Sequence, residues 1–342
     1  MRPAEAGGSR PDVVAGAPPR IPEDGGSAQV ERGAAAVLNA LTVDVEDYFQ
    51  VQALECRVDR ESWDRLESRV CRNTDRLLEL FEDAHVSATF FVLGWVADRY
   101  PGLLRRVVGA GHEVASHGYE HRVLHSMTPE EFRSDLRRAR VALEQAVGRP
   151  VQGYRAPSFS ITRSTMWALD VLIEEGYLFD ASIYPVYHDR YGIPDWPRQI
   201  HRVERSGGGI WELPGSTVRW GGVNFPMGGG GYFRLLPYPW TRWGIDHLNA
   251  AEGQPAVFYL HPWEIDPGQP RINVSGLSRL RHYRNLHKTE RRLRRLLSEF
   301  AFGTVSDVLM RSAGLPATPP SAPGTNAQTS TIRPDDFSLP YG

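Results

Sequence analysis

The sequence predicts an α/β fold with a parallel sheet, and three observations favour a (β/α) barrel. Short apolar runs rich in β-branched and aromatic residues alternate with segments of helical period. Seven such runs lie between residues 38 and 263, a number that suits a barrel better than a short open sheet. Polar residues follow several of the runs directly, at the strand ends where such barrels hold their chemistry.

Each of the seven predicted strands is a mostly apolar run of residues. We place them at residues 38–45, 88–94, 112–116, 151–157, 178–184, 210–216 and 256–263. Helical periodicity between the first five strands predicts helices at residues 73–84, 100–111, 128–148 and 162–176. Thr128, followed by Pro129 and Glu131, is a helix start signal, and Gly148 and Gly176 mark helix ends.

The tails differ in composition from the segment between them. Residues 1–36 are dominated by Ala, Gly, Pro and Ser without the apolar core of a signal peptide, so we expect a disordered leader. We expect the barrel over residues 37–265, a C-terminal extension packed on it over 266–312, and a disordered tail over 313–342. No apolar run approaches the length of a membrane span, so we expect a cytoplasmic protein without a transmembrane segment.

The overall composition argues against several classes of partner. Lys and Arg total 39 against 41 Asp and Glu, so we expect no general attraction to nucleic acid or anionic membranes. The basic segment 278–300 is interpreted as a solvated amphipathic helix. Cys56 and Cys71 are too few for a disulfide framework and are interpreted as free thiols. The sequence does not predict an oligomeric state.

The first strand ends in three acids, Asp44, Glu46 and Asp47, inside an otherwise apolar stretch. A buried carboxylate is costly unless it is paired or binds a metal. Residues two apart on a strand share a face, so Asp44 and Glu46 are expected to point the same way. Asp47 stays an alternative to Glu46 as a metal ligand.

The third strand is followed by His117, His121 and His125, each four residues from the next. One helical turn would bring either neighbouring pair onto one side, and two histidines with a carboxylate form a common zinc site. Histidine pairs alone are more often surface or capping residues. The metal site gains weight because other predicted strand ends carry Arg155, and then His261, after apolar runs.

These motifs together resemble the polysaccharide deacetylases of carbohydrate esterase family 4. The resemblance covers about residues 38–310 and rests on "VDVEDYF", "SHGYEH", "YRAPSF", "FDASIYP" and "YLHPWE" in this order. It is greatest to the exosortase-associated, exopolysaccharide-cluster branch. The resemblance implies a distorted (β/α)7 barrel of the polysaccharide deacetylase type.

The resemblance also implies a role for each matching residue. Asp44 matches the catalytic base, Arg155 the arginine that holds the base, and His261 the general acid. The implied metal ligands are Glu46, His117 and His121, and the implied substrate-binding residues are Leu260, Pro157, Tyr154 and Trp263. Much of the family has two adjacent Asp residues where this chain has Asp44, Val45 and Glu46. His125 matches no family role.

The function implied is a metal-dependent hydrolase that removes N-acetyl groups from N-acetylhexosamine units of a polysaccharide or oligosaccharide in exopolysaccharide biosynthesis. The implied cofactor is a divalent metal, Zn²⁺ with Co²⁺ as the alternative, and the implied partner is an N-acetylated glycan. Two other hypotheses stay open: another non-peptide amide hydrolase on the same barrel, and a non-catalytic glycan-binding protein. A zincin protease is disfavoured because His117 is followed by Gly118, where His-Glu-x-x-His requires an acid.

Overall fold

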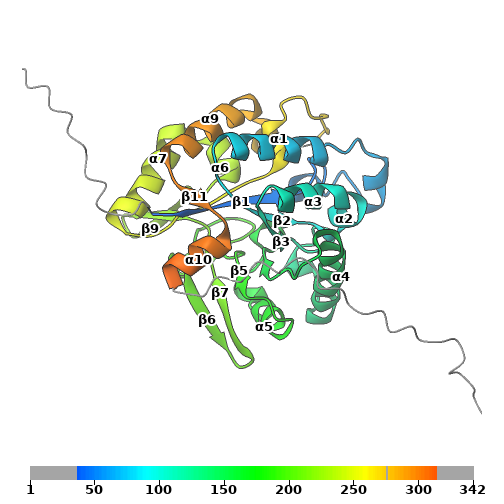
Figure 1. Cartoon of the computed structure of the whole chain (residues 1–342), viewed down its shortest axis with the longest axis horizontal. Coiled ribbons are helices and arrows are strands. Elements are labelled where there is room, and N and C mark those ends of the chain that lie inside the picture. Colours follow the sequence, from blue (N-terminus) through cyan, green and yellow to red (C-terminus); the bar gives the residue numbers. More distant parts are fainter. Residues whose placement is uncertain (1–36, 275, 314–342) are drawn as a thin grey trace, which may run out of the picture. The chain divides into compact units, whose positions relative to one another are not determined.

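The computed structural model describes residues 37–274 and 276–313. The predicted leader, 1–36, and nearly all of the predicted tail, 313–342, lie outside the described residues. The fold is built on a mostly parallel sheet with helices around it (Figure 1).

The seven predicted strands are all present and form one parallel series in the order β10-β1-β2-β3-β4-β5-β7. An unpredicted strand, β6 (His201–Arg205), pairs antiparallel with β7 at the edge. No strand pairing in the described part joins this edge to β10, so the predicted distorted (β/α)7 barrel is confirmed in a form that does not close. The strands are β1 (Asn39–Val45), β2 (Thr89–Val92), β3 (Glu113–Ser116), β4 (Gly153–Tyr154), β5 (Phe179–Asp180), β7 (Gly208–Glu212) and β10 (Val257–Leu260).

Strand β1 lies second in the strand order, next to β10, and every one of its residues is buried. It pairs with β10 on one side and β2 on the other, with Val43 opposite Leu260 and Asp44 opposite Phe91. The carboxyl ends of these strands therefore meet, which is where a parallel barrel places functional side chains. A short strand, β11 (Phe302–Gly303), also pairs with the beginning of β1.

The four predicted helices are confirmed with small changes in their ends. Helix α4 (Pro129–Val147) begins with the predicted capping box, in which Thr128 and Glu131 each accept a backbone N–H of the other. It ends at Gly148, whose φ of 70° suits glycine. The other helices before β10 are α1 (Val70–Asp83), α2 (Gly94–Arg99), α3 (Pro101–Gly109), α5 (Trp167–Glu174), α6 (Gly230–Leu235) and α7 (Tyr238–Asp246).

The segment between β7 and β10 approaches β10 very closely. Strands β8 (Thr217–Trp220) and β9 (Val223–Pro226) form a separate hairpin, and Gly229 then bridges to Tyr259. A Cβ atom on Gly229 would lie 2.0 Å from the carbonyl oxygen of Tyr259, and its φ is 121°, so only glycine fits. Gly230, the first residue of α6, also lies against Tyr259, so this contact brings the start of α6 to β10.

The predicted basic helix over 278–300 is two helices, α8 (Gly276–Tyr283) and α9 (Leu286–Glu299). The break falls at Asn285, whose φ is 60°. Helix α9 is amphipathic as predicted. Its apolar side buries Leu293 and Leu296, and Arg294 pairs with Asp83 of α1 at 3.1 Å.

The last described helix, α10 (Val305–Ala313), follows β11 and contacts β1. Helix α9 contacts the 3-10 helix η7 (Pro262–Ile265), which follows β10. The division between a barrel that ends at 265 and an extension over 266–312 stays a prediction.

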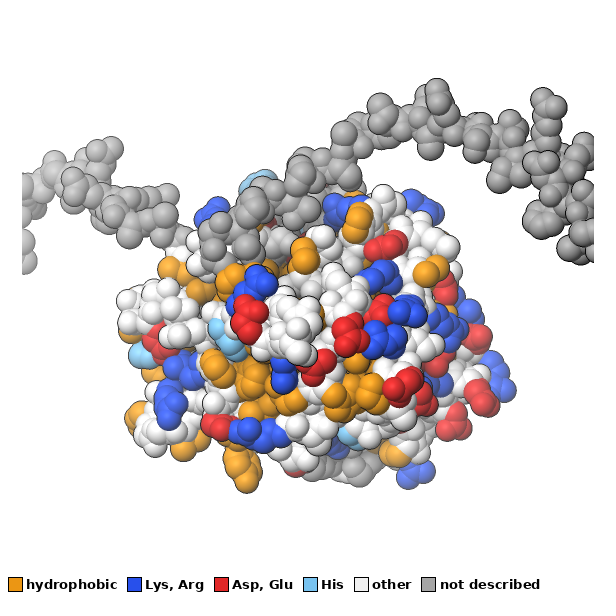
Figure 2. Space-filling model, turned by 90° about the horizontal axis from the view of Figure 1, so that it is seen from below, with side chains coloured by type: hydrophobic (Ala, Val, Ile, Leu, Met, Phe, Trp, Pro, Cys, Tyr) orange, Lys and Arg blue, Asp and Glu red, His pale blue; other side chains and the backbone are white. Residues whose placement is uncertain are grey.

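Within the described residues no helix has the length and hydropathy to cross a membrane. On the face shown in Figure 2, basic and acidic side chains are interspersed around an apolar area.

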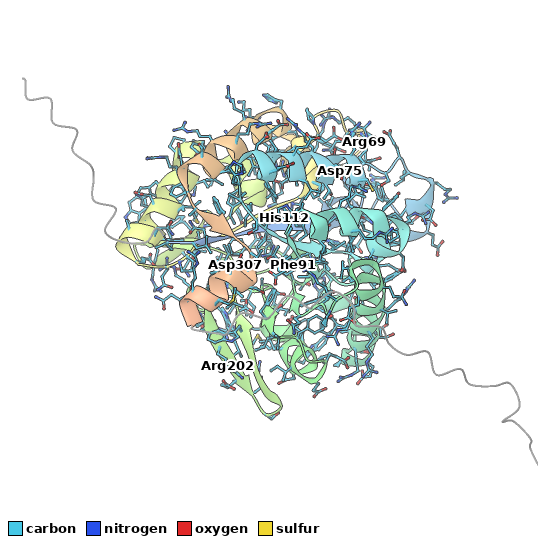
Figure 3. The ribbon with its side chains drawn as sticks, viewed as in Figure 1. Arg69, Asp75, Phe91, His112, Arg202 and Asp307 are labelled. Atoms are coloured by element: carbon cyan, nitrogen blue, oxygen red, sulfur yellow. The ribbon has the colours of Figure 1, made fainter. Side chains whose placement is uncertain are left out.

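His112, at the start of β3, is a buried base that must stay neutral in the fold (Figure 3). Its Nδ1 atom accepts a hydrogen bond from the backbone N–H of Ala88 at 3.1 Å, and its ring packs on Phe81 and Phe90. Burial lowers the pKa of His112 from 6.5 to about 4. Its contribution to stability is therefore complete above pH 6.5 and is lost as the pH falls toward 4.

We expect the wild-type protein to lose about 2 kcal/mol more unfolding free energy than the His112→Asn variant between pH 7.5 and pH 5. Asparagine keeps an acceptor for the Ala88 N–H but cannot take up a proton. Urea unfolding at both pH values measures the difference. Equal losses in the two proteins would show that His112 is not the responsible group.

Candidate active site

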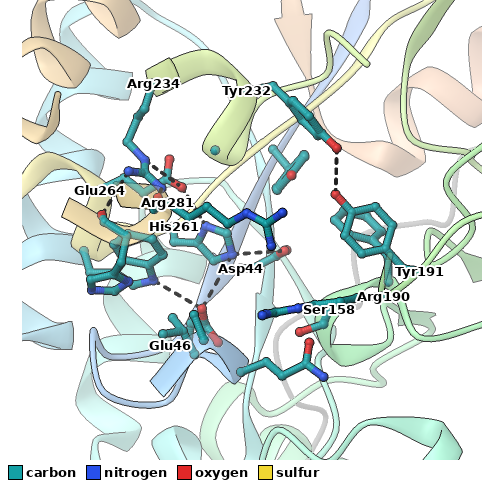
Figure 4. Close-up of a pocket in the computed structure, with 18 of the residues that line it drawn as sticks. Asp44, Glu46, Ser158, Arg190, Tyr191, Tyr232, Arg234, His261, Glu264 and Arg281 are labelled. Atoms are coloured by element: carbon teal, nitrogen blue, oxygen red, sulfur yellow. Dashed lines mark hydrogen bonds and ion pairs between the residues drawn. The ribbon is translucent and has the colours of Figure 1, made fainter. Parts of the chain in front are cut away.

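A cavity of about 430 Å³ opens at the carboxyl ends of β1, β3 and β10. Asp44 is the next-to-last residue of β1, Glu46 follows that strand, and His261 follows β10. All three side chains line the cavity (Figure 4). His117 and His121, from the loop after β3, complete its inner wall. The structure thus brings together five of the six residues expected to carry metal binding and catalysis, and the sixth, Arg155, lies directly behind Asp44.

Glu46, His117 and His121 form a group that could hold a metal ion. One ligand atom from each lies within 4.8 Å of the others, and all three residues are buried. The Oε2 atom of Glu46 accepts no hydrogen bond from any described residue, although His121 Nε2 lies 2.9 Å away. A buried carboxylate oxygen without a donor, facing two imidazoles, fits a divalent cation of the zinc type.

Hydrogen bonding fixes which nitrogen of His117 faces the site. Its Nδ1 atom lies 2.8 Å from the carbonyl oxygen of Arg155. A carbonyl oxygen can only accept, so Nδ1 carries the proton and Nε2 keeps a free lone pair. Burial lowers the pKa of His117 to about 4, which keeps the ring neutral. A neutral imidazole is the form that binds metals.

His117 and His121 are not brought together by a helical turn, so that prediction is wrong. They lie in a loop in which Gly118 has a φ of 75° and His121 a φ of 52°. Arg60 holds the loop from outside by donating to the carbonyl oxygen of Glu120 at 2.9 Å. His125 is exposed, outside the cavity lining.

The structure distinguishes Glu46 from Asp47. Asp47 faces the start of α1, where its Oδ2 atom accepts from the backbone N–H groups of Arg69 and Val70 and from the Ser68 hydroxyl. These bonds satisfy orphan donors of the helix N-terminus. Asp47 is therefore occupied in holding α1, and Glu46 is the acid that the geometry offers to a metal.

The histidines around Glu46 affect the pKa of its carboxyl more strongly than burial does. Burial alone would raise the pKa of the Glu46 carboxyl, but its interactions with the neighbouring histidines, above all His121, lower it to about 2. Trp263 also donates its indole N–H to Glu46 Oε1 at 3.2 Å, which orients the carboxylate. Glu46 is thus held ionised and in one orientation.

Asp44 and Arg155 form a buried ion pair, with Nη1 and Oδ1 2.7 Å apart. Arg155 is fixed by two further hydrogen bonds, from Nη1 to the Thr42 hydroxyl at 2.8 Å and from Nε to the Ala181 carbonyl oxygen at 3.0 Å. Its guanidinium also stacks over Phe91. The second carboxylate oxygen of Asp44, Oδ2, faces the cavity and lies 3.9 Å from His261 Nε2.

His261 is held by an acid that sequence reasoning missed. Its Nδ1 atom lies 3.1 Å from Oε1 of Glu264, which is fully buried and pairs in turn with Arg234 of α6. Burial would lower the pKa of His261, but Glu264, Glu46 and Asp44 raise it to about 9. The acid three positions after the histidine in "HPWE" was the available signal for Glu264.

The predicted substrate-binding residues divide into two groups. Trp263 lines the cavity, stacked between His261 and His282. Tyr154 and Leu260 are fully buried in hydrophobic clusters and do not line the cavity, and Pro157 is also buried outside its lining. Their neighbours Ser158, Phe159 and Tyr259 line it instead. A side chain adjacent to a strand end alternates between core and cavity, which explains these misplacements.

The outer wall of the cavity holds residues that lie outside the sequence motifs. They are His188, Arg190 and Tyr191 from the loop after β5, Tyr232 from α6, and Arg281 from α8. The hydroxyl groups of Tyr191 and Tyr232 lie 3.0 Å apart and join that loop to α6 (Figure 4). No sequence motif indicated these residues, because they come from three separate segments.

Two segments of the chain match family models of known proteins. Residues 63–173 match the family model described as polysaccharide deacetylase, and residues 181–310 match a domain of unknown function, DUF3473. The first match contains His117, His121 and Arg155. Asp44 and Glu46 precede it, and His261 falls within the second match.

Two curated relatives agree with the first match. The chain is 30% identical over 133 residues to a peptidoglycan deacetylase of Helicobacter pylori, which covers 38% of this chain and 44% of that protein. It is 32% identical over 99 residues to a chitooligosaccharide deacetylase of Bradyrhizobium sp., covering 29% of this chain and 43% of that protein. The chain therefore spans less than half the length of each of these relatives.

A solved structure supports the fold. The crystal structure of a candidate polysaccharide deacetylase from Mycobacterium smegmatis is similar with a TM-score of 0.56 at 21% identity, covering 85% of this chain and 95% of that one. Together the matches show that part of this chain is similar to polysaccharide deacetylases. The exopolysaccharide-associated branch stays a prediction.

We expect Glu46→Gln to weaken zinc binding at least about 100-fold, because it removes a charged ligand from the group of three. Isothermal titration of zinc into metal-free protein measures this. Asp47→Asn is the matched control: it should bind zinc like the wild type while losing about 1 kcal/mol of stability through weaker capping of α1. Zinc binding that depends on Asp47 and not on Glu46 would reverse the assignment.

Proposed function

We propose that this protein is a metal-dependent hydrolase that removes N-acetyl groups from N-acetylhexosamine units of a polysaccharide or oligosaccharide. The observation that carries the proposal is the convergence of the three metal-site residues with Asp44 and His261 in one cavity. The names of the two curated relatives support the substrate class. Zinc is the proposed ion, with cobalt as the alternative, and exopolysaccharide biosynthesis is the proposed setting.

Glu46, His117 and His121 would hold the ion. When bound, the ion supplies Lewis acidity that polarises an acetyl carbonyl and lowers the pKa of a water molecule. The protein fixes the orientation of these side chains by hydrogen bonds. Trp263 orients Glu46, and the Arg155 carbonyl oxygen orients His117. Both supports are buried, so the ligand positions are set before substrate arrives.

Asp44 is the proposed general base. Its Oδ1 atom is occupied by Arg155, which leaves Oδ2 as the oxygen that faces the cavity and can accept a proton from water. Arg155 compensates the buried negative charge of Asp44, and three fixed contacts prevent the guanidinium from moving away. Asp44 thus carries its charge in a place where an isolated carboxylate would be very costly.

His261 is the proposed general acid. Glu264 holds its Nδ1 atom, so Nε2 is directed toward Asp44 and Glu46 on the inner wall. An N–H group at Nε2 can protonate the amine nitrogen as the amide C–N bond breaks. Base and acid therefore reach the same small volume from two neighbouring strands, β1 and β10.

We expect purified zinc-loaded protein to release acetate from N-acetylglucosamine oligosaccharides, and Asp44→Asn to slow the release by about 100- to 10,000-fold. Enzymatic assay of free acetate measures the rate. Asp75→Asn is the control, because Asp75 pairs with Arg106 of α3 on the exposed side of α1, outside the cavity lining. Absence of acetate release with either zinc or cobalt, or equal rates in wild type and Asp44→Asn, would contradict the proposal.

A further inference from the structure

The outer wall of the cavity carries positive charge that the inner site does not use. Two arginines line the cavity: Arg190 from the loop after β5 and Arg281 from helix α8. Both side chains extend into the cavity (Figure 4). They lie away from the sequence motifs of the inner site. Their chemistry therefore needs a separate explanation.

The inner acids are already compensated. Asp44 pairs with Arg155, Glu264 pairs with Arg234, and Glu46 faces the two metal-site histidines. These are the only acids among the described residues that line the cavity. The outer arginines therefore do not serve to neutralise the catalytic carboxylates.

The outer arginines have little compensation of their own. No carboxylate of the described residues forms an ion pair with Arg190. Arg281 has one partner, Asp189, with Nη1 and Oδ2 3.6 Å apart, which is too long for a good hydrogen bond. Asp189 is itself exposed and also contacts His188 at 3.1 Å. The outer wall thus presents two guanidinium groups, of which only that of Arg281 is within ion-pair distance of a described carboxylate, at 3.6 Å.

The backbone beneath Arg190 is held by ring packing on both sides. His188 stacks on Tyr191 with centroids 3.9 Å apart, and Tyr191 stacks in turn on the buried Tyr184 at 5.9 Å. The Tyr191 hydroxyl is bound to Tyr232 of α6. A guanidinium presented from a fixed backbone loses less entropy on binding a ligand.

Arg281 is likewise anchored through its backbone. Its carbonyl oxygen accepts a hydrogen bond at 2.8 Å from Arg234, the arginine that pairs with Glu264. A change in the Arg281 side chain leaves this bond in place. The role of its guanidinium can therefore be tested without removing the support of the inner site.

We propose that Arg190 and Arg281 form a subsite for an oxyanion, a carboxylate or a phosphate, on the glycan next to the sugar that loses its acetyl group. Guanidinium groups bind both oxyanions through paired N–H donors. The inference rests on the proposed function for the reacting sugar and adds that the preferred substrate is an anionic glycan. Of the two sources, a carboxylate would come from a uronic acid and a phosphate from a sugar nucleotide or a lipid-linked precursor.

Three probes with the same reacting sugar test the subsite. They are the neutral N-acetylglucosamine tetrasaccharide, a tetrasaccharide alternating N-acetylglucosamine with glucuronic acid, and uridine diphosphate N-acetylglucosamine. We expect the wild type to act on at least one anionic probe with a higher kcat/KM than on the neutral one. Arg190→Gln and Arg281→Gln should each lower kcat/KM for that probe by about tenfold and leave the neutral probe within about twofold.

Arg279→Gln is the matched control, because Arg279 is exposed on the same helix and does not line the cavity. It removes one charge without touching the subsite, so its kcat/KM values should match the wild type. Selectivity for the anionic probe should also fall as sodium chloride is raised, since salt screens exposed charges. Preference for the carboxylate probe or the diphosphate probe identifies the source of the oxyanion.

Binding separates failure of the inference from failure of the proposed function. Titration of the anionic probes into zinc-loaded Asp44→Asn protein should show about tenfold weaker binding when Arg190→Gln is added. That result would support the subsite even if the wild type released no acetate. Equal loss on neutral and anionic probes, or no loss on either, would overturn the subsite while leaving the deacetylase assignment to its own test.

Discussion

The burial of two carboxylates at the carboxyl end of β1 is the constraint on which the rest of the site depends. Asp44 and Glu46 are each 2% exposed, and an unpaired ionised carboxylate in such a place would be very unfavourable. The chain meets this requirement in two different ways. A fixed cation, Arg155, compensates Asp44, whereas two imidazoles that can also bind metal surround Glu46. In the proposed mechanism, one acid is thereby left to handle protons and the other to hold an ion.

Both solutions require segments that are distant in the chain. Arg155 follows β4, His117 follows β3, and Trp263 and Glu264 follow β10, so all of these strands must pair in the observed order before the acids are compensated. Removing one partner of a buried pair typically costs about 3–5 kcal/mol, because the other charge stays buried. Fold and site are therefore coupled. The DUF3473 segment takes part in this coupling, because it supplies His261, Trp263 and Glu264.

Much of this arrangement could be predicted from the sequence, because acids and histidines directly after apolar runs are visible without a structure. The strands, the start of α4, and a metal site made of an acid after β1 and histidines after β3 follow from such local patterns, and the family resemblance implied the particular set Glu46, His117 and His121. The choice between Glu46 and Asp47 could not be made, because it depends on residues 68–70 returning to bind Asp47. The arginines of the outer wall were missed for the same reason: only the folded chain brings Arg190 and Arg281 to one cavity. The core position of Tyr154 could not be predicted, because β4 is only two residues long and its sequence does not show which side chains face the cavity.

The central claim is that one divalent ion sits between Glu46 and the two histidines, within reach of Asp44 and His261. Crystals grown with zinc and measured on both sides of the zinc absorption edge test it most directly, since anomalous differences locate the ion independently of the protein coordinates. The account predicts one strong peak at about 2.0–2.2 Å from Glu46, His117 and His121. A fully occupied zinc at another position in the cavity, or three well-ordered side chains with no peak between them, would contradict it.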